Sequence, residues 1–225
     1  MTPRVHNEWH NRIISEYSSA AVTARLLHQM IVLGMEDKLI DSCMRIIRDE
    51  LDHARLSYEC LCSLGGSSDP IKLKQSIIPQ TINSASPLII LLDDLLFSFL
   101  LGESFAVPLF NAMYAQTTHP QARQMLERVL QDEAFHRAFG WMVLDSLLEH
   151  NIEGVREHIA SSLPKALLEF KNGYAPEFDL PPLQPLERSM GLLDLDQYKT
   201  IWYQTYREDI SNRFKKRGFE TPSIS

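Results

Sequence analysis

Two long stretches in the first third of the chain place apolar residues at intervals of three and four, the spacing of a helix with one buried face. In the first stretch, from about residue 10 to 33, these positions are Ile13, Ile14, Tyr17, Ala20, Ala21, Ala24, Leu27 and Ile31. Gly34 follows as a stop signal, and a second stretch runs from about residue 36 to 64, where Gly65-Gly66 ends it. The pattern predicts a tight hairpin of two helices.

A second helical hairpin is predicted between residues 86 and 149. Ser86-Pro87 supplies an N-cap and a first-turn proline for a helix that reaches about residue 115. Thr118, His119 and Pro120 repeat this start signal before a helix that ends near residue 149. The intervening residues 67–85 are polar and turn-rich, and their number suits a connection that crosses the length of a bundle. We therefore expect an all-α four-helix bundle with a long crossover between helices 2 and 3.

The last third of the chain has shorter helical patterns. A helix is expected over 152–162, ending before Pro164, with a resumption over 165–172 and a proline-rich loop over 174–185. Asp194 and Gln197 have the spacing of a capping box before a last helix that ends near Arg217-Gly218. The chain is expected to divide into a four-helix bundle, 1–150, and a C-terminal helical extension packed on it, 151–225.

Composition narrows the class of protein and its location. The 225 residues carry a net charge of −7 and no long cluster of Lys and Arg, which disfavours nucleic acid as a partner. The most apolar stretch, 87–110, contains Asp93, Asp94 and Glu103 and is interrupted by Pro108, so a membrane span is not expected. Three cysteines without C-x-x-C spacing and a charged N-terminal region favour the reducing cytoplasm.

The sequence D-E-x-x-H occurs twice, as Asp49-Glu50 with His53 and as Asp132-Glu133 with His136. Helical positions three apart lie on one face, so each Glu and His can bind the same metal ion. A single E-x-x-H is weak evidence, because Glu and His are common on exposed faces. Two copies on core-forming helices favour a metal, since buried carboxylates without a cation are costly.

The other two predicted helices each supply one further acid at the same height. Glu16 and Glu50 are equally far from the turn near residue 33, and Glu103 and Glu133 from the turn near residue 118. At ~1.5 Å per residue, all four carboxylates lie about 22–26 Å from their turns. Asp94 lies about 180° from Glu103 around the helix and is the poorer candidate. The predicted dinuclear layer consists of Glu16, Glu50, His53, Glu103, Glu133 and His136.

Two further features near this layer carry predictions. Asp49 and Asp132 lie four residues before the paired histidines, and each is expected to accept the outer N–H of the histidine on the opposite helix. The alternative is that each is an exposed acid paired with Arg48 or Arg137. In the third helix, Gly102 beside Glu103 and Pro108 shortly after it predict a kink or a π-bulge near the metals.

The order Glu, E-x-x-H, Glu, E-x-x-H on four successive helices resembles the ferritin-like di-iron carboxylate superfamily over roughly residues 10–150. The resemblance implies that Glu50 and Glu133 bridge two metals, whereas Glu16 and Glu103 are terminal ligands. It implies two Fe ions that cycle between Fe²⁺ and Fe³⁺. Because carboxylate and imidazole also suit Mn, this metal remains open for one or both sites.

The length and the long C-terminal tail are similar to those of small soluble di-iron oxygenases, among them the aldehyde-deformylating oxygenases and the tRNA hydroxylases. This likeness implies an O₂-dependent monooxygenase or oxidase of a small organic substrate, with the six ligands as its catalytic residues. The chain has no flavin or nicotinamide fingerprint, so an external donor of the ferredoxin or flavin reductase type is expected. Homodimerisation stays open. The alternatives are a ferroxidase or iron-storage protein, which fits the same six ligands, and a metal-free helical scaffold.

Overall fold

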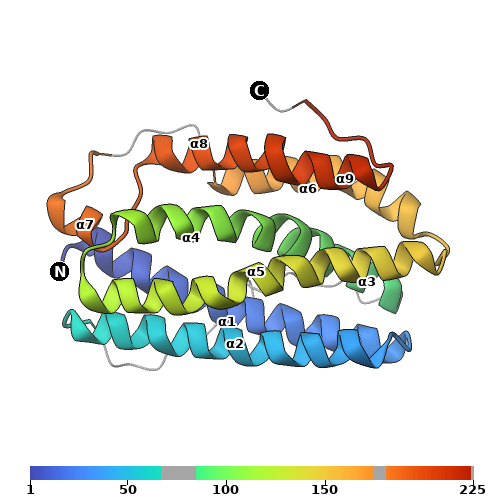
Figure 1. Cartoon of the computed structure of the whole chain (residues 1–225), viewed down its shortest axis with the longest axis horizontal. Coiled ribbons are helices and arrows are strands. Elements are labelled where there is room, and N and C mark those ends of the chain that lie inside the picture. The colour runs from blue at the N-terminus through green and yellow to red at the C-terminus, as the bar shows by residue number, and fades with distance from the viewer. Residues whose placement is uncertain (67–84, 175–180, 224–225) are drawn as a thin grey trace.

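The computed structural model describes residues 1–66, 85–174 and 181–223, and all regular structure in these ranges is helical (Figure 1). The predicted all-α class is confirmed. In chain order, the elements are α1 (Pro3–Val32), α2 (Asp37–Ser63), α3 (Pro87–Asp94), the π-helix η2 (Leu95–Glu103), α4 (Ser104–Gln116), α5 (Pro120–Glu149), α6 (Val155–Tyr174), α7 (Pro185–Ser189), α8 (Leu195–Thr205), the π-helix η3 (Tyr206–Ile210) and α9 (Ser211–Lys216).

The bundle consists of two hairpins. Helices α1 and α2 pack along their length, and α5 packs against α2 on one side and against η2 and α4 on the other. Helices α6, α8 and α9 form a further layer beside α4 and α5, on the side away from α2 (Figure 1). The predicted four-helix bundle is confirmed, while residues 67–84 of the expected crossover lie outside the described residues. The division at residue 150 stays a prediction.

Helix α1 begins about two turns earlier than its sequence pattern indicated. Thr2 is the N-cap, its hydroxyl oxygen accepting a hydrogen bond from the backbone N–H of Val5, and Pro3 occupies the first turn. The same hydroxyl donates to Glu187 at 2.9 Å. Val5 and Trp9 are fully buried and continue the apolar face toward the N-terminus. The expected start at residue 10 was therefore wrong, because a cap and a proline extend the helix.

The third helix of the bundle changes its winding next to the predicted site. Residues Leu95–Glu103 form a π-helix between α3 and α4, and Pro108 lies inside α4. Proline has no N–H, so the carbonyl of Ser104 lacks its α-helical donor at this position. Each backbone hydrogen bond of a π-helix spans one residue more than in an α-helix, which changes the direction of the side chains that follow. The predicted disturbance near Glu103 is confirmed.

Helix α6 continues through Pro164, where the sequence predicted a break. Ile159 and Leu163 before the proline and Leu167 and Phe170 after it are all buried, whereas Pro164 is exposed. Packing of these residues on the bundle outweighs the hydrogen bond that the proline removes. The last helix was also expected to be uniform, but the π-helix η3 separates α8 from α9.

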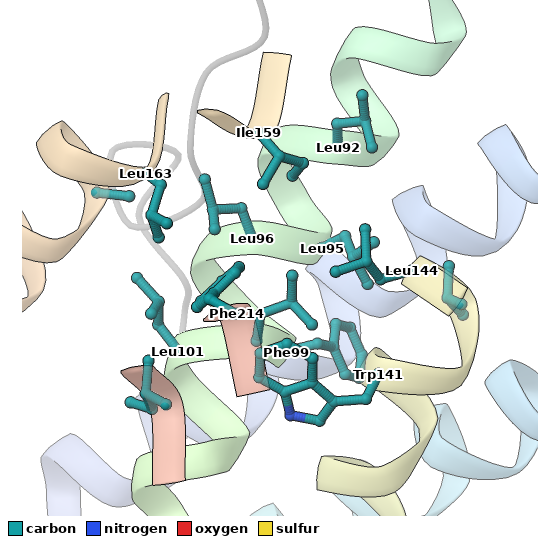
Figure 2. Close-up of a cluster of buried hydrophobic side chains, with 14 of the residues drawn as sticks. Leu92, Leu95, Leu96, Phe99, Leu101, Trp141, Leu144, Ile159, Leu163 and Phe214 are labelled. Atoms are coloured by element: carbon teal, nitrogen blue, oxygen red, sulfur yellow. The ribbon is translucent and has the colours of Figure 1, made fainter. Parts of the chain in front are cut away.

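Two apolar clusters occupy the two ends of the molecule. The larger one combines the end of α1, the start of α2, the buried leucines and Phe99 of η2, the end of α5 and the C-terminal helices. Figure 2 shows part of it: Phe99 of η2 lies beside Trp141 of α5 and Leu95 of η2 beside Leu144 of α5, and Leu163 of α6 and Phe214 of α9 belong to the same cluster. The smaller cluster combines the start of α1, the end of α2 and the start of α5. The predicted ligands lie between the two clusters.

Within the described ranges, none of the helices is both long and apolar enough to cross a membrane.

Candidate metal centre

Four elements bring the six predicted ligands into one buried layer between the apolar clusters. The residues come from α1, α2, the last position of η2, and α5, and each is between 0 and 7% exposed. They are Glu16, Glu50, His53, Glu103, Glu133 and His136. The layer is polar because the apolar face of each helix is interrupted here, and the apolar residues on both sides keep water away from it.

The two imidazole rings lie side by side, with ring centroids 5.8 Å apart, and each directs Nδ1 toward carboxylates. His53 Nδ1 lies 3.9 Å from Glu16 Oε2, 3.8 Å from Glu50 Oε2 and 3.9 Å from Glu133 Oε1. His136 Nδ1 lies 3.2 Å from Glu50 Oε1. Donor atoms that share one ion at about 2 Å each are about 3–4 Å apart, so these separations fit metal ligands.

The donors form two groups that can each hold a metal ion. Glu16, Glu50 and His53 make up one group, and Glu50, Glu103 and His136 the other, with the donor atoms of each group within 4.8 Å of one another. Glu50 belongs to both groups, which is the arrangement of a carboxylate that bridges two metals. Glu133 lies beside both groups, where it contacts His53 and interacts with Glu103. Its assignment as a second bridge stays a prediction.

Three buried donor atoms in this layer lack hydrogen-bond partners among the described residues. They are His53 Nδ1, His136 Nδ1 and Glu133 Oε2. Buried polar atoms ordinarily have hydrogen-bond partners. An unprotonated imidazole nitrogen and an ionised carboxylate both accept hydrogen bonds, so they cannot bond to each other unless one of them is protonated. A cation would satisfy all three atoms together, so the residues present fit a pair of divalent metal ions.

The outer nitrogens of the two histidines are held by acids from the opposite helix. His53 Nε2 lies 3.1 Å from Asp132 Oδ2, and His136 Nε2 lies 3.4 Å from Asp49 Oδ2. The predicted exchange of acids between α2 and α5 is confirmed. A carboxylate acceptor keeps the proton on Nε2 and leaves the Nδ1 lone pair for the ligand layer.

One arginine links these two acids at the surface. Arg45 lies 3.3 Å from Asp49 Oδ2 through Nε and 3.6 Å from Asp132 Oδ1 through Nη2, and Arg128 also pairs with Asp132. The arginines that pair with the acids are thus Arg45 and Arg128, not the Arg48 or Arg137 of the alternative interpretation. The imidazoles, the acids and the arginines form a continuous network from the layer to the surface of α2 and α5.

The crowded acids change one another's pKa values. Burial raises the pKa of Glu16 and Glu133 well above the ordinary value, with a further increase from neighbouring carboxylates, Glu50 for Glu16 and Glu103 for Glu133. Burial also raises the pKa of Glu103, and Glu50 adds to it. Without metal, the layer therefore retains protons that a divalent cation would displace.

Glu50 and His136 shift in the directions of an ion pair. Burial by itself would raise the pKa of Glu50, but its pairing with His136 and His53 outweighs burial and holds that pKa below its ordinary value. Burial by itself would lower the pKa of His136, but the adjacent Glu50 carboxylate raises it to about 9. The shared ligand Glu50 is therefore the acid of this layer that stays ionised most readily.

The other acids of the third bundle segment are bound elsewhere. Asp94 accepts two hydrogen bonds from Arg25, at 2.7 and 2.5 Å, and Asp93 lies 2.7 Å from His158 Nε2. Glu103 is the acid of this segment that faces the layer. The next residue, Ser104, is bound to α5, because its hydroxyl oxygen accepts a hydrogen bond from the ring N–H of Trp141 at 3.2 Å. This contact helps to fix the position of Glu103.

A cavity of about 760 Å³ lies against the layer and is lined from α1, η2, α4, the end of α6 and residues 192–198. Glu16, Glu50, Glu103 and Glu133 form part of its wall, so a small molecule inside it can approach the metal positions. This volume is within the usual range of about 300–1,000 Å³ for small-molecule sites.

Three lining residues of this cavity were missed from the sequence. Arg12 lies one turn before Glu16 on the same face of α1, a spacing that could have identified it. Tyr174 and Tyr198 come from segments far away in the sequence. Tyr174 packs on Phe105 with ring centroids 4.7 Å apart and is 38% exposed.

Neither a protein-family model nor a curated protein matches the chain. A solved structure from Synechococcus, described as a protein 19 with aldehyde deformylating oxidase activity, is similar over 96% of this chain and 92% of its own, with a TM-score of 0.61 and 16% sequence identity. The chain has a ferritin-like fold. At this identity the likeness shows the fold, and the predicted ferritin-like architecture is confirmed.

Proposed function

We propose that this ferritin-like chain is a non-haem di-iron monooxygenase or oxidase that uses O₂ to oxidise a small organic molecule. The observation that carries the proposal is the pair of Glu and His groups that share Glu50, on the wall of a cavity large enough for an organic substrate. The similar Synechococcus structure, described as having aldehyde deformylating oxidase activity, supports chemistry of this class on this fold.

The donor set suits a pair of iron or manganese ions, and we propose iron. Glu16, Glu50 and His53 would hold one ion and Glu50, Glu103 and His136 the other, with Glu133 beside both. Carboxylate with imidazole suits Fe and Mn, and four carboxylates balance the charge of two divalent ions. Two ferrous ions held there would supply the electrons for the reduction of O₂.

The side chains of this chain have separate tasks in such a reaction. The apolar clusters on both sides of the layer exclude bulk water from the reacting atoms. Asp132 and Asp49 keep a proton on Nε2 of His53 and His136 and so fix the direction of each Nδ1. The cavity holds the substrate beside Glu16 and Glu103.

An oxygenase of this kind needs electrons from outside the chain. The sequence has no flavin or nicotinamide fingerprint, so we propose an external donor of the ferredoxin or flavin reductase type. The three cysteines without C-x-x-C spacing support a cytoplasmic location. Arg45 and Arg128 are the exposed charges closest to the two histidine–acid pairs, and a donor with an acidic surface would complement them.

The same six ligands would serve a ferroxidase or iron-storage protein, and the cavity favours the oxygenase over it. Iron storage requires a closed shell of many chains around a mineral core. An oxygenase requires space for an organic molecule beside the metals, and the cavity supplies it. Gel filtration separates the two functions, because the storage protein would elute as a large shell and the oxygenase as a small assembly.

The direct test of the proposed function is reconstitution with ferrous iron in the absence of air. We expect about two ions per chain, and we expect O₂ consumption once a reductant and air are added. Glu50→Gln should lose both ions, because Glu50 is shared. Glu59→Gln is the matched control on the exposed face of α2, and it should bind iron like the wild type. Fewer than about one ion per two chains would disprove the proposal.

A further inference from the structure

One wall of the cavity is a charged face of α1. Arg4, Glu8, Arg12 and Glu16 follow one another at intervals of four residues and all line the cavity. Apart from the four acids of the metal layer, Arg4, Glu8 and Arg12 are the charged side chains among the described lining residues. Their formal charges sum to +1, so this end of the cavity is complementary to an occupant with a single negative charge.

Arg12 is the buried member of this face. It is 7% exposed, and its guanidinium lies over the rings of Trp9 and Phe110, 5.2 and 5.4 Å from their centroids. These aromatic contacts hold the planar group in place without neutralising it. Burying a charged arginine costs free energy, so a buried Arg12 indicates a specific interaction rather than a contribution to solubility.

Two nitrogens of the Arg12 guanidinium lack hydrogen-bond partners among the described residues. Nη2 pairs with Glu8 Oε1 at 3.3 Å and contacts the sulfur of Met113. Nε and Nη1 have no hydrogen-bond partner among the described residues, although both are buried. Buried donors are ordinarily satisfied. A carboxylate that displaced Glu8 from Nη2 would engage Nη2 and Nη1 together, the fork of donors that matches its two oxygens.

The part of the cavity lined by α4 is apolar. Phe105, Leu109 and Phe110 of α4 line it, together with Leu192 and Leu193 of the loop before α8. Arg12 and Glu16 are one helical turn apart, about 6 Å along α1. The occupant that fits these surfaces has an anionic group at one end and a short apolar body that reaches the metal layer.

We propose that the cavity binds a small monocarboxylate as the substrate of the proposed oxygenase, with its carboxylate on Arg12. The apolar body lies on Phe105 and Leu109, which places the carbon to be oxidised beside Glu16 and Glu103. This assignment rests on the proposed function and names its substrate class. A phosphate monoester, with close to two charges, exceeds the single positive charge of the wall. A cationic amine would meet Arg12 directly.

Glu8 pairs with the guanidinium that the substrate carboxylate would bind. Its side chain is 28% exposed, pairs with Arg12 and interacts with Tyr198. A carboxylate ligand competes with Glu8 for the same guanidinium, and Glu8 can turn toward solvent when it is displaced. Removing the charge of Glu8 should therefore strengthen the binding of an acid and leave a neutral analogue unaffected.

The test compares 3-phenylpropanoate with 3-phenylpropanamide, which have the same body and differ in charge. Both are titrated by calorimetry into the full chain loaded with ferrous iron, without air, so that no turnover occurs. We expect the wild type to bind the acid at least about tenfold more tightly than the amide. Arg12→Gln should bind both about equally, with unchanged iron content. Arg55→Gln, which removes an exposed arginine of α2, should keep the wild-type preference.

The affinities of Arg12→Gln show whether direct coordination to the metals explains the preference for the acid. A carboxylate that bound the metals without Arg12 would keep its preference over the amide in Arg12→Gln, and this outcome would overturn the proposal. Equal affinity for acid and amide in the wild type would overturn it as well.

A second variant decides the question if Arg12→Gln does not fold. Glu8→Gln should bind 3-phenylpropanoate several-fold more tightly than the wild type, whereas its affinity for 3-phenylpropanamide stays the same. Phenethylamine, the cation of similar size, should bind the wild type more weakly than the acid. Weaker acid binding by Glu8→Gln, or an amine that binds more tightly than the acid, would contradict the assignment.

These measurements are independent of oxygen chemistry. A protein that prefers the acid through Arg12 but never consumes O₂ would disprove the proposed function and leave the carboxylate site intact. A protein that consumes O₂ but shows no dependence on Arg12 would leave the oxygenase intact and remove the substrate class.

Discussion

His53 of α2 is paired through Nε2 with Asp132 of α5, 3.1 Å away, although 79 positions separate them in the chain. The reciprocal pair, His136 with Asp49, ties the same two helices together a second time. Because each outer nitrogen is engaged in this way, both Nδ1 atoms face Glu50. The orientation of the proposed ligands is therefore set by contacts between helices rather than within one.

Asp132→Asn should weaken metal binding. The amide cannot accept the Nε2 proton as strongly as a carboxylate does, so the imidazole of His53 loses basicity and orientation. We expect a loss of about 10- to 100-fold in affinity for ferrous iron, measured without air by competition with a chelator. Asp52→Asn removes an exposed acid of α2, the helix that carries His53, and is the control. Equal affinities for the two variants would contradict the role of Asp132.

Stability of the metal-free chain should fall as pH rises from 5 to 8. The pKa values of Glu16 and Glu133 are raised in the folded state, so above pH 4.5 the unfolded chain loses these protons while the folded chain still holds them. The folded state therefore loses stability relative to the unfolded state as pH rises. His136, with its pKa raised to about 9, contributes stability that is complete below 6.5 and is lost as pH rises through 9. The free energy of unfolding should fall by about 1.4 kcal/mol per pH unit for each additional proton held.

The metal-loaded chain should respond in the opposite direction, because ligands must lose protons before they bind a cation. Glu50 does not change the direction of the stability trend between pH 5 and 8. Its pKa is lowered, so its contribution to stability is already complete above 4.5. Thermal unfolding at several pH values, with a chelator and with ferrous iron in the absence of air, measures both trends. Parallel trends would show that the layer does not bind the metal.

Gly140→Ala should destabilise the bundle, although alanine is the better helix former. An added Cβ at Gly140 would lie 2.6 Å from Cβ of Phe99, which is fully buried and packs on Phe139. The clash should cost about 1–3 kcal/mol, which exceeds the gain of about 1 kcal/mol in helix propensity. Urea unfolding measures the difference. Gly173→Ala in α6 is the control, because its Cβ would meet nothing within 4 Å, and it should be neutral or stabilising.

Glu133→Ala should abolish oxygen-dependent turnover while the protein stays folded. The substitution removes a buried carboxylate with a raised pKa, so the metal-free fold loses an unfavourable group rather than a supporting one. Circular dichroism checks the fold and an oxygen electrode the turnover. Glu149→Ala, at the exposed end of the same helix, should behave like the wild type. Unchanged turnover in Glu133→Ala would refute its assignment as a ligand.

Part of this site was predictable because it depends on local spacing. Positions three and four apart share a helix face, so the two D-E-x-x-H sequences predict Glu50 beside His53 and Glu133 beside His136. Equal distances from the two predicted turns then align Glu16 and Glu103 with them. The structure groups Glu50 with His53, but it groups His136 with Glu50 and Glu103. The π-helix near Glu103 was also expected, since Gly102 and Pro108 weaken regular α-helical hydrogen bonds.

The sequence by itself determined the helical periods, their caps and the level at which the acids meet, because these follow from the geometry of a single helix. Only the tertiary structure decided that α6 continues through Pro164, that Arg45 joins the two acids and that Arg12 lines a cavity with Tyr174. Each of these depends on which distant segments pack together. Burial between such segments outweighs local preference, and no spacing along one helix specifies it.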